Sequence, residues 1–416
     1  MTEEKNDEIR KALHDHLAQW GLKRWATARE YLAWQQRLVA PETLERFAEQ
    51  AERRRGGQSC ADVAFYDLSA QPGLLSVLHS QRYDYYESAG LSVASRIGDA
   101  ACILDFGCGV GILTTFYARL FSDRRFVGID RSEASIAAAR RKADELGLSN
   151  VRFECLDVGA DRNGPSEAYD LILSTHALVQ HERDPGLPSA SWRTFERARD
   201  AGQQAAFERR TGMGARLDRL ASVLTRQGRM IALEKTRQLA RRVPFQRAMA
   251  ARGMHLIEKP ELIRYRIFED ATDDGPLYHV RKGIEPSLEW DESPEPDDGL
   301  PFDPVCVTKS SREVGAPLYE NHRPSAQAAW ERLIDRIVTK EATRREPDGR
   351  ELHVELGIAN GLAYLYCANT FDQRQLVVFE SAHAHALESY YREIVEGMPS
   401  PAPSGNSPRA DREKQK

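Results

Sequence analysis

The sequence has no long apolar run, no paired-cysteine motif and no marked excess of charge of one sign. No stretch of its 416 residues approaches the roughly 20 consecutive apolar residues that a transmembrane helix requires. The segment Met1–Arg10 is charged from the outset and no apolar segment follows it. We therefore expect neither a secretion signal nor a membrane anchor, and a cytoplasmic location.

The cysteines and the net charge argue against disulfide-rich, metal-binding and generally nucleic-acid-binding proteins. The six cysteines form no C-x-x-C pair and have no companion histidines at metal-ligand spacing, so we expect reduced thiols and no metal site. A net charge of −5 gives no general attraction to nucleic acid or to an anionic membrane, although a local basic face could still exist. We expect no membrane partner and favour other partners over nucleic acid. The sequence does not indicate an oligomeric state.

Residues 1–90 are expected to form a helical extension at the N-terminus. Pro41 fits the first turn of a helix, and a segment rich in aromatic residues extends from Phe65 to Tyr86. Apolar stripes at helical spacing precede that segment, comprising Leu13, Leu17 and Trp20, then Trp25, Ala28 and Leu32, then Leu44, Phe47 and Ala51.

Residues 91–283 are expected to form an α/β core, because apolar strand-like runs alternate with amphipathic helical segments. This pattern specifies a doubly wound parallel sheet covered by helices on both faces. An insertion at 175–214 separates the fourth and fifth strands. The predicted strands are Cys102–Phe106, Phe126–Asp130, Val151–Cys155, Asp170–Ser174 and Arg229–Glu234, with antiparallel additions near His255–Glu258, Leu262–Phe268 and Leu277–Val280.

The remaining chain is expected to comprise a linker, a small domain and a tail. Residues 284–303 are acidic and proline-rich, a composition that cannot bury enough apolar surface to order itself alone. Residues 304–398 suggest a small α+β domain, and residues 399–416 a disordered tail. Within the small domain we predict a helix from Pro324 with Trp330, Leu333, Ile334 and Ile337 on one face, strands at Glu351–Leu356, Leu362–Ala368 and Gln375–Glu380, and a final helix capped by Ser381.

The residues that most strongly suggest a function follow the first predicted strand. Asp105 stands at its end, and Gly107, Gly109 and Gly111 occupy every second position of the next turn. Glycine there permits positive φ and lets the backbone approach a ligand at a helix N-terminus. A dinucleotide fingerprint would need glycine at position 112, which is isoleucine, so we expect no nicotinamide or flavin dinucleotide.

The segment 103–111 resembles the first motif of class I S-adenosylmethionine-dependent methyltransferases, whose glycine turn passes under the methionine part of the cofactor. Asp130 ends the second strand, where this family uses an acidic residue to accept both ribose hydroxyls. Asp157 matches the third motif, whose acidic residue accepts a hydrogen bond from the adenine amino group. The resemblance covers roughly residues 89–282 and implies a Rossmann-like core with S-adenosylmethionine as cofactor.

The resemblance also implies a set of cofactor-binding residues, and it leaves the subfamily open. After Ser174 the sequence reads Thr-His-Ala-Leu, which matches neither the motif of amino-group nucleic-acid methyltransferases nor the acidic pair of protein arginine methyltransferases. The implied cofactor residues are Asp105, Gly107, Cys108, Gly109, Gly111, Asp130, Arg131, Asp157, Val158 and Ser174.

A base for the acceptor is optional, because methyl transfer mainly requires the nucleophile and the methyl group to be held in line in a dry pocket. His176 and His181 are the candidates for that role, since both should lie near the end of the fourth strand. The alternative is that either histidine only packs or caps.

We expect a methyltransferase acting on a small molecule, with the aromatic segment and the insertion covering the acceptor pocket. Trp192 and Phe195 of the insertion are large apolar groups available to exclude water there. The alternatives are a protein or RNA substrate presented by the C-terminal domain, and a regulatory protein that binds the cofactor without catalysis.

Overall fold

The computed structural model describes residues 3–55, 61–159, 165, 167–179, 184–283, 288–303, 316–346 and 349–397. The chain divides into two compact units. The first comprises Met1–Leu187 and Arg199–Glu292, and the second comprises Pro188–Ala198 and Ser293–Lys416. The tail that we expect to be disordered, at 399–416, lies outside the described residues.

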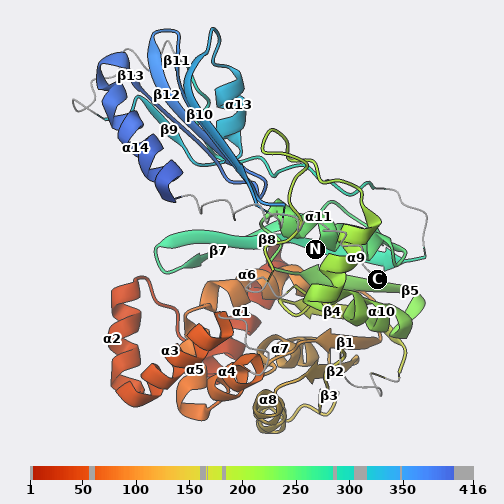
Figure 1. Cartoon of the computed structure of the whole chain (residues 1–416). Helices are drawn as coiled ribbons and strands as arrows, with labels where there is room; N and C mark the ends of the chain where they lie inside the picture. Colours follow the sequence, from red (N-terminus) through yellow and green to blue (C-terminus); the bar gives the residue numbers. More distant parts are fainter. Residues whose placement is uncertain are drawn as a thin grey trace, which may run out of the picture. The chain divides into compact units, whose positions relative to one another are not determined.

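An eight-stranded sheet forms the centre of the first unit (Figure 1). Its order is β3-β2-β1-β4-β5-β8-β6, and β7 pairs with β8. Strands β1 to β5 pair in parallel, whereas β8 pairs antiparallel with β5, β6 and β7. All eight predicted strands are present, and β5 begins earlier than predicted. Their bounds are β1 Cys102–Phe106, β2 Arg125–Asp130, β3 Val151–Cys155, β4 Tyr169–Thr175, β5 Leu224–Leu233, β6 Met254–Leu256, β7 Glu261–Ile267 and β8 Asp270–Lys282.

Helices cover both faces of this sheet. On one face, Ile103 and Leu171 are buried in a cluster with helices α1, α6 and α7. On the other face, Leu104 and Ile172 are buried with α9, α10 and α11. Neighbouring residues of a strand thus point into opposite cores, which explains why the strands are apolar throughout. The first unit is a Rossmann-like doubly wound domain, with helices α7 Ile112–Leu120, α8 Glu133–Glu145, α9 Ala201–Thr211, α10 Met213–Val223 and α11 Leu239–Ala250.

Among the described residues, six helices precede the sheet, in the part of the chain for which the sequence predicts a helical extension. Helix α3 begins at Pro41, which occupies the position that we expected. The predicted stripe of α2 is wrong in phase, because Leu32 is 48% exposed whereas Tyr31 and Trp34 are buried. The bounds are α1 Glu3–Gln19, α2 Ala28–Leu38, α3 Pro41–Arg55, α4 Ala61–Ser69, α5 Pro72–Ser80 and α6 Tyr83–Ala94.

The second unit contains a five-stranded antiparallel sheet of order β10-β11-β12-β13-β9. Helix α13 contributes Ala326 and Ala329 to the core on one face, and α14 contributes Leu387 and Tyr391 to the core on the other. The described elements are β9 Tyr319–Asn321, α13 Ser325–Glu331, β10 Ile337–Arg345, β11 Glu351–Ala359, β12 Leu362–Asn369, β13 Arg374–Glu380, η1 Ser381–His383 and α14 Ala384–Gly397.

The helix predicted from Pro324 through Ile337 is shorter than expected. It ends at Glu331, and Ile337 begins strand β10 instead. Asp335 has a φ of 53°, a left-handed conformation that no α-helix continues through. Strands β9 and β10 were not predicted, because β9 is short and the residues of β10 are largely exposed, so neither shows a clear apolar pattern.

Two segments differ from the expected domain plan. Residues 188–198, which we expected to be part of an insertion in the first unit, belong to the second. The predicted linker contributes side chains to both cores: Trp290 packs in the first unit, and Phe302, only 5% exposed, lies in the core of the second. No helix among the described residues has the length and apolar character needed to cross a membrane.

Candidate functional site

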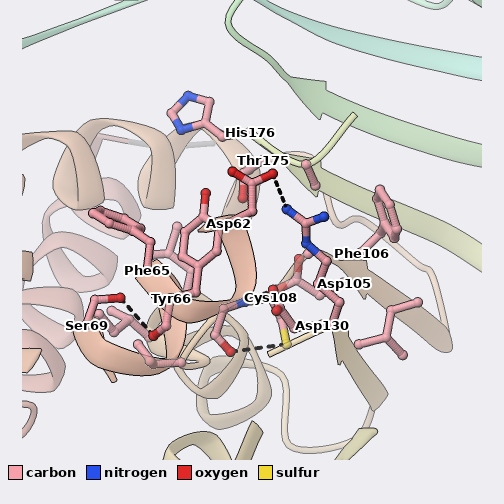
Figure 2. A pocket seen from close by; sticks show the side chains of 18 of the residues that line it. Asp62, Phe65, Tyr66, Ser69, Asp105, Phe106, Cys108, Asp130, Thr175 and His176 are labelled. Carbon is pink, nitrogen blue, oxygen red and sulfur yellow. Dashed lines mark hydrogen bonds and ion pairs between the residues drawn. The ribbon is translucent and has the colours of Figure 1, made fainter. Parts of the chain in front are cut away.

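A cavity of about 400 Å³ lies at the carboxyl edge of the parallel strands, within the first unit (Figure 2). The ends of β1, β2 and β4 form one wall, and residues of α3 to α6 form the other. This is the edge at which open α/β sheets bind ligands. The two walls come from distant parts of the sequence, so the N-terminal helices complete the site.

The three glycines of the turn after β1 all have positive φ, but they serve different purposes. A Cβ on Gly107 would lie 2.3 Å from Cβ of Ala177, so this glycine permits close packing with the turn after β4. A Cβ on Gly109 would meet nothing within 4 Å, and Gly109 lines the cavity. Gly111 does not line the cavity; it allows α7 to begin against Phe153.

Asp105 and Asp130 lie at the ends of adjacent strands and both line the cavity. The Thr114 hydroxyl donates a hydrogen bond to Asp105 at 2.5 Å. Burial raises the pKa of Asp105 to about 6, against the effect of this hydrogen bond. Asp130 accepts a hydrogen bond from the backbone N–H of Gly109 at 3.0 Å and of Ser132 at 2.9 Å. The Asp130 carboxylate therefore also holds the glycine turn.

The other expected cofactor residues divide into two groups. Cys108, Arg131, Asp157 and Val158 line the same cavity. Ser174 does not: it is fully buried and donates a hydrogen bond to Glu234. Sequence matching thus identified residues that meet around one space, apart from Ser174 and Gly111.

Asp62 connects the N-terminal helices to the strand ends. This carboxylate is 5% exposed and accepts hydrogen bonds from Arg54 at 3.2 Å and from Arg131 at 3.0 Å. Figure 2 shows it beside Tyr66, across the cavity from Asp105. On the same helix, Asp67 accepts a 2.6 Å hydrogen bond from the Ser132 hydroxyl. Helix α4 is therefore fixed to the end of β2 by charged contacts.

A polar cluster surrounds His176, which follows β4 and lines the cavity. Its Nε2 lies 3.1 Å from Oδ2 of Asp274, and its Nδ1 lies 3.4 Å from a guanidinium nitrogen of Arg82. The Tyr265 hydroxyl donates a 2.6 Å hydrogen bond to the same Asp274 oxygen. The His176 ring also stacks on Tyr85, with 5.0 Å between ring centroids.

These contacts set the charge of the cluster. Burial lowers the pKa of His176 to about 4, although Asp274 opposes the shift, so the ring is neutral at pH 7. Burial alone would raise the pKa of Asp274, but the adjacent His176 ring, the hydrogen bond from Tyr265 and the charge of Arg82 hold it well below its usual value. The ionised Asp274 thus faces a neutral histidine. The second candidate base, His181, lies outside the described residues.

Glu234, directly after β5, holds the turn that carries His176. Its fully buried carboxylate accepts hydrogen bonds from the Ser174 hydroxyl at 2.7 Å and from the backbone N–H groups of Ala177, Leu178 and Val179 at 3.1–3.2 Å. Burial raises the pKa of Glu234, and these hydrogen bonds oppose the shift. Because three consecutive N–H groups donate to one carboxylate, the backbone that directly follows His176 is held in place.

The predicted cover of the cavity has two parts, the aromatic segment and the insertion. Residues of the aromatic segment, among them Phe65 and Tyr86, do line the cavity. Trp192 takes no part in a cover, because it is buried in the core of the second unit, whereas the role of Phe195, which belongs to the same unit, stays a prediction. Trp192 is 6% exposed and stacks on His353 with 3.6 Å between centroids.

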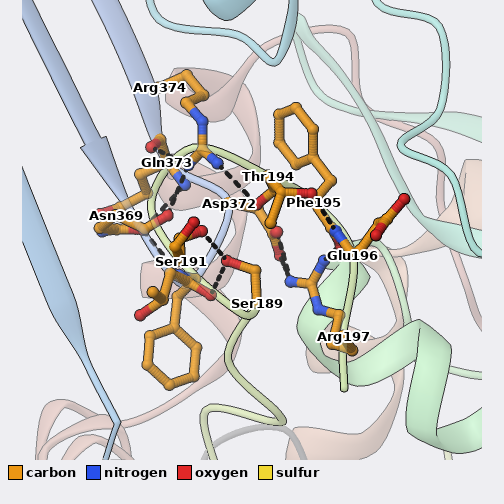
Figure 3. A network of polar contacts seen from close by, with 12 residues as sticks. Ser189, Ser191, Thr194, Phe195, Glu196, Arg197, Asn369, Asp372, Gln373 and Arg374 are labelled. Carbon is orange, nitrogen blue, oxygen red and sulfur yellow. Dashed lines mark hydrogen bonds and ion pairs between the residues drawn. The ribbon is translucent and has the colours of Figure 1, made fainter. Parts of the chain in front are cut away.

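Side chains around Phe195 show why that segment stays in the second unit (Figure 3). The guanidinium of Arg374 lies 4.4 Å from the centre of the Phe195 ring and donates a 3.2 Å hydrogen bond to the carbonyl oxygen of Thr194. Arg197 forms an ion pair with Asp372. These partners are residues of the antiparallel sheet and its turns, which no local pattern in 188–198 reveals.

Sequence reasoning missed Asp62, Arg82, Glu234 and Asp274. Asp62, Arg82 and Asp274 fall outside the matched motifs, and contacts that hold these residues at the cavity join distant positions. Asp62 and Arg131 are 69 positions apart, and Arg82 and Asp274 are 192 positions apart. The only local signal was position, since Glu234 ends a predicted strand. Among the described residues, no group of three or more His, Cys, Asp or Glu side chains could hold a metal ion.

Comparison with known proteins identifies a family model and relatives that match parts of this chain. Residues 103–202 match the family model described as a methyltransferase domain. A tRNA (guanine-N(7)-)-methyltransferase from Rubrobacter xylanophilus is 33% identical over 123 residues, 29% of this chain and 52% of that protein. A ubiquinone biosynthesis O-methyltransferase from Bradyrhizobium diazoefficiens is 34% identical over 85 residues, 20% of this chain and 31% of that protein. The chain thus spans about half or less of the length of these curated relatives.

One similar solved structure is a magnesium protoporphyrin IX methyltransferase from Synechocystis with bound SAM. It is 17% identical, with a TM-score of 0.33, and the match covers 50% of this chain and 81% of that one. The family match at 103–202 is the more informative finding, because it includes the glycine turn, Asp130, Asp157 and His176.

Proposed function

We propose that this chain, whose residues 103–202 form a methyltransferase domain of the class I, S-adenosylmethionine-dependent kind, methylates a small molecule. One observation carries the proposal. The glycine turn, Asp130 and Asp157 match three separate motifs, and Gly107 and Gly109 of the turn line a single cavity with Asp130 and Asp157.

The residues around the cavity fit S-adenosylmethionine. The open space above Gly109 accommodates a ligand that passes close to the backbone. Each oxygen of Asp130 accepts one backbone N–H and keeps a further lone pair, so the carboxylate could accept both ribose hydroxyls. Asp157 and Val158 would hold the adenine. When bound, the cofactor supplies a methyl group on a sulfonium centre, and the protein orients the acceptor and excludes water.

The N-terminal helices favour a small acceptor. They close one side of the cavity and are fixed there by Asp62 and Asp67, so the space beside the cofactor residues is walled on two sides. An RNA or protein acceptor is the alternative, because one relative is named as a tRNA methyltransferase and another as a release factor glutamine methyltransferase. The expected cytoplasmic location stays a prediction.

Labelled methyl transfer tests the proposal. The protein is incubated with methyl-labelled S-adenosylmethionine and fractionated cell extract, and Gly109→Val is the matched control, because a side chain there would fill the ligand space. Label in the small-molecule fraction supports the proposal. Label in RNA or protein would contradict the small-molecule acceptor. Absence of transfer, with S-adenosylhomocysteine still binding, would indicate a regulatory protein.

A further inference from the structure

Figure 2 shows His176 apart from Asp105 and Asp130, which match the cofactor motifs, and Arg82 lies 3.4 Å from His176. We infer that the methyl acceptor is a hydroxylated aromatic molecule, that Nδ1 of His176 removes its hydroxyl proton, and that Arg82 faces the oxygen. The inference rests on the proposed function and adds the accepting atom and the class of acceptor to it.

The polar contacts around His176 leave one ring nitrogen for a substrate. Oδ2 of Asp274 lies near three donors: the Tyr265 hydroxyl at 2.6 Å, Nε2 of His176 at 3.1 Å and Arg82 at 3.4 Å. A carboxylate only accepts, so the His176 proton belongs on Nε2 and Nδ1 carries the lone pair. Within the part of the chain that the structure describes, the polar contact of Nδ1 is the 3.4 Å approach of Arg82, at the outer limit of hydrogen bonding, which a substrate hydroxyl could replace.

The backbone of His176 indicates that its placement is functional. His176 has a φ of 58°, a left-handed conformation that residues other than glycine adopt uncommonly. Non-glycine residues in this region persist only where their surroundings impose it, and they cluster at ligand-binding and active sites. Glu234 imposes it here, by binding the three N–H groups that follow.

The walls beside His176 suit a flat apolar ring. Tyr85 stacks on the His176 ring, and Tyr86 lies edge-on to Tyr85 at 5.5 Å. Phe65 and Tyr66 also line the cavity, with 5.4 Å between their centroids in an edge-on arrangement. Aromatic rings favour such offset and edge-to-face partners. A ring with a hydroxyl would fill this space and present its oxygen to Nδ1 of His176 and to Arg82.

The proposed step balances without any further reactant. The hydroxyl proton moves to Nδ1 of His176, and the positive ring that results is paired with Asp274. An oxygen lone pair forms a bond to the methyl carbon as the carbon–sulfur bond breaks, and the bonding electrons stay on sulfur. The products are a methyl ether and a neutral thioether. Arg82 stabilises the negative charge that develops on the oxygen.

The accepting atom can be identified without knowing the acceptor. The protein is incubated with 13C-methyl S-adenosylmethionine and the small-molecule fraction of an extract, and the labelled product is analysed by carbon NMR. A methyl-ether shift with a long-range correlation to a ring carbon supports the inference. An N-, S- or C-methyl signal, or an ether on an aliphatic carbon, overturns it and leaves the proposed function standing. Absence of transfer overturns both.

Variants then test the roles of the two catalytic side chains, with that fraction as acceptor. His176→Gln and Arg82→Gln should each lower turnover by about a hundredfold or more, with affinity for S-adenosylhomocysteine within about twofold of the unchanged protein. The preserved affinity shows that the fold is intact. If turnover of His176→Gln falls less than threefold, His176 is not the base.

Asp274 is a positioning residue, since it acts through His176. Asp274→Asn should lower kcat with little change in KM, because the amide can keep the ring in place but cannot balance its positive charge. Asp274→Glu should recover part of the loss. Asp273→Asn is the matched control on the same strand: Asp273 lies 3.8 Å from Arg237 and does not line the cavity. Equal losses in Asp273→Asn and Asp274→Asn would refute the role of Asp274.

Discussion

Replacing Glu234 by glutamine tests how the turn that carries His176 is held. The carboxylate accepts two hydrogen bonds on each oxygen: from Ser174 and Ala177 on Oε1, and from Leu178 and Val179 on Oε2. Glutamine keeps one acceptor oxygen and turns the other position into a donor. The best placement directs the amide nitrogen at Ser174 and Ala177, because the serine hydroxyl can rotate and accept, whereas the Ala177 N–H cannot.

One buried N–H group then loses its acceptor, which costs roughly 1–3 kcal/mol. Alanine would remove the acceptor of three backbone N–H groups, a cost of roughly 3–9 kcal/mol that approaches the whole stability of a domain. Glu234→Gln should therefore yield a folded protein with a lower melting temperature, by roughly 2–4 °C per kcal/mol in a domain of this size. Glu234→Ala should fail to fold stably.

The measurement is thermal unfolding of Glu234→Gln beside a matched control, with methyl transfer measured on the same samples. Glu145→Gln serves as control, because Glu145 is 61% exposed and its ion pair with Lys142 is a surface contact. We expect the control to melt within a degree of the unchanged protein. If Glu234→Gln melts at the same temperature as the control and transfers methyl groups normally, the turn does not depend on the carboxylate.

Three further predictions follow from the site. Asp130→Asn should weaken S-adenosylhomocysteine binding tenfold or more in calorimetric titration, because a hydrogen bond to a charged group is worth roughly 1.5–3 kcal/mol; unchanged affinity would remove Asp130 from the site. Gly109→Val should abolish that binding and also lower the free energy of unfolding by roughly 1–3 kcal/mol, because Gly109 has a positive φ of 55°; retained binding in the folded variant would place the ligand elsewhere. Burial lowers the pKa values of His16, His79 and His176 to about 4, so the unfolded chain binds more protons than the folded one between pH 6.5 and 4. The contribution of these histidines to the free energy of unfolding should be complete above about pH 6.5 and fall toward pH 4, by up to about 3 kcal/mol per histidine. Urea unfolding across this range should show that dependence on pH, and His79→Gln should make it less steep. A free energy of unfolding that does not change with pH would contradict the lowered pKa values.

The sequence predicted those parts of the site whose residues lie close together in the chain and follow a local pattern. Strand β1, the glycine turn and Asp130 lie within a short stretch whose apolar runs and positive-φ glycines have a direct physical meaning, and the structure places them at one cavity. The prediction that the helix from Pro324 continues through Ile337 was wrong, although the sequence favours a strand at this point. Ile337 and Val338 are β-branched residues, which favour strands, and helical spacing alone was the weaker guide.

The rest could not be predicted because its partners are distant in sequence. Asp274 and Arg82 belong to a hairpin and to a helix start that no motif marks, and only the folded chain brings them to His176. Trp192 was assigned to the cavity because the insertion that carries it follows the fourth strand at the carboxyl edge of the sheet. Its stacking partner, His353, lies with it in the second unit, and no pattern within the insertion identifies that partner.

The chain passes from one unit to the other three times, since residues 188–198 and 293 onward belong to the second unit and 199–292 to the first. The two units are therefore not modules that a single cut can separate. Truncation after Glu292 would leave Trp192 without the ring of His353 and Arg197 without its ion pair to Asp372. An apolar and a charged side chain that are buried in the complete chain would then be exposed. A deletion of the second unit, or its replacement by a related domain, would have to include both residues 188–198 and the chain from 293 onward to leave a protein that folds.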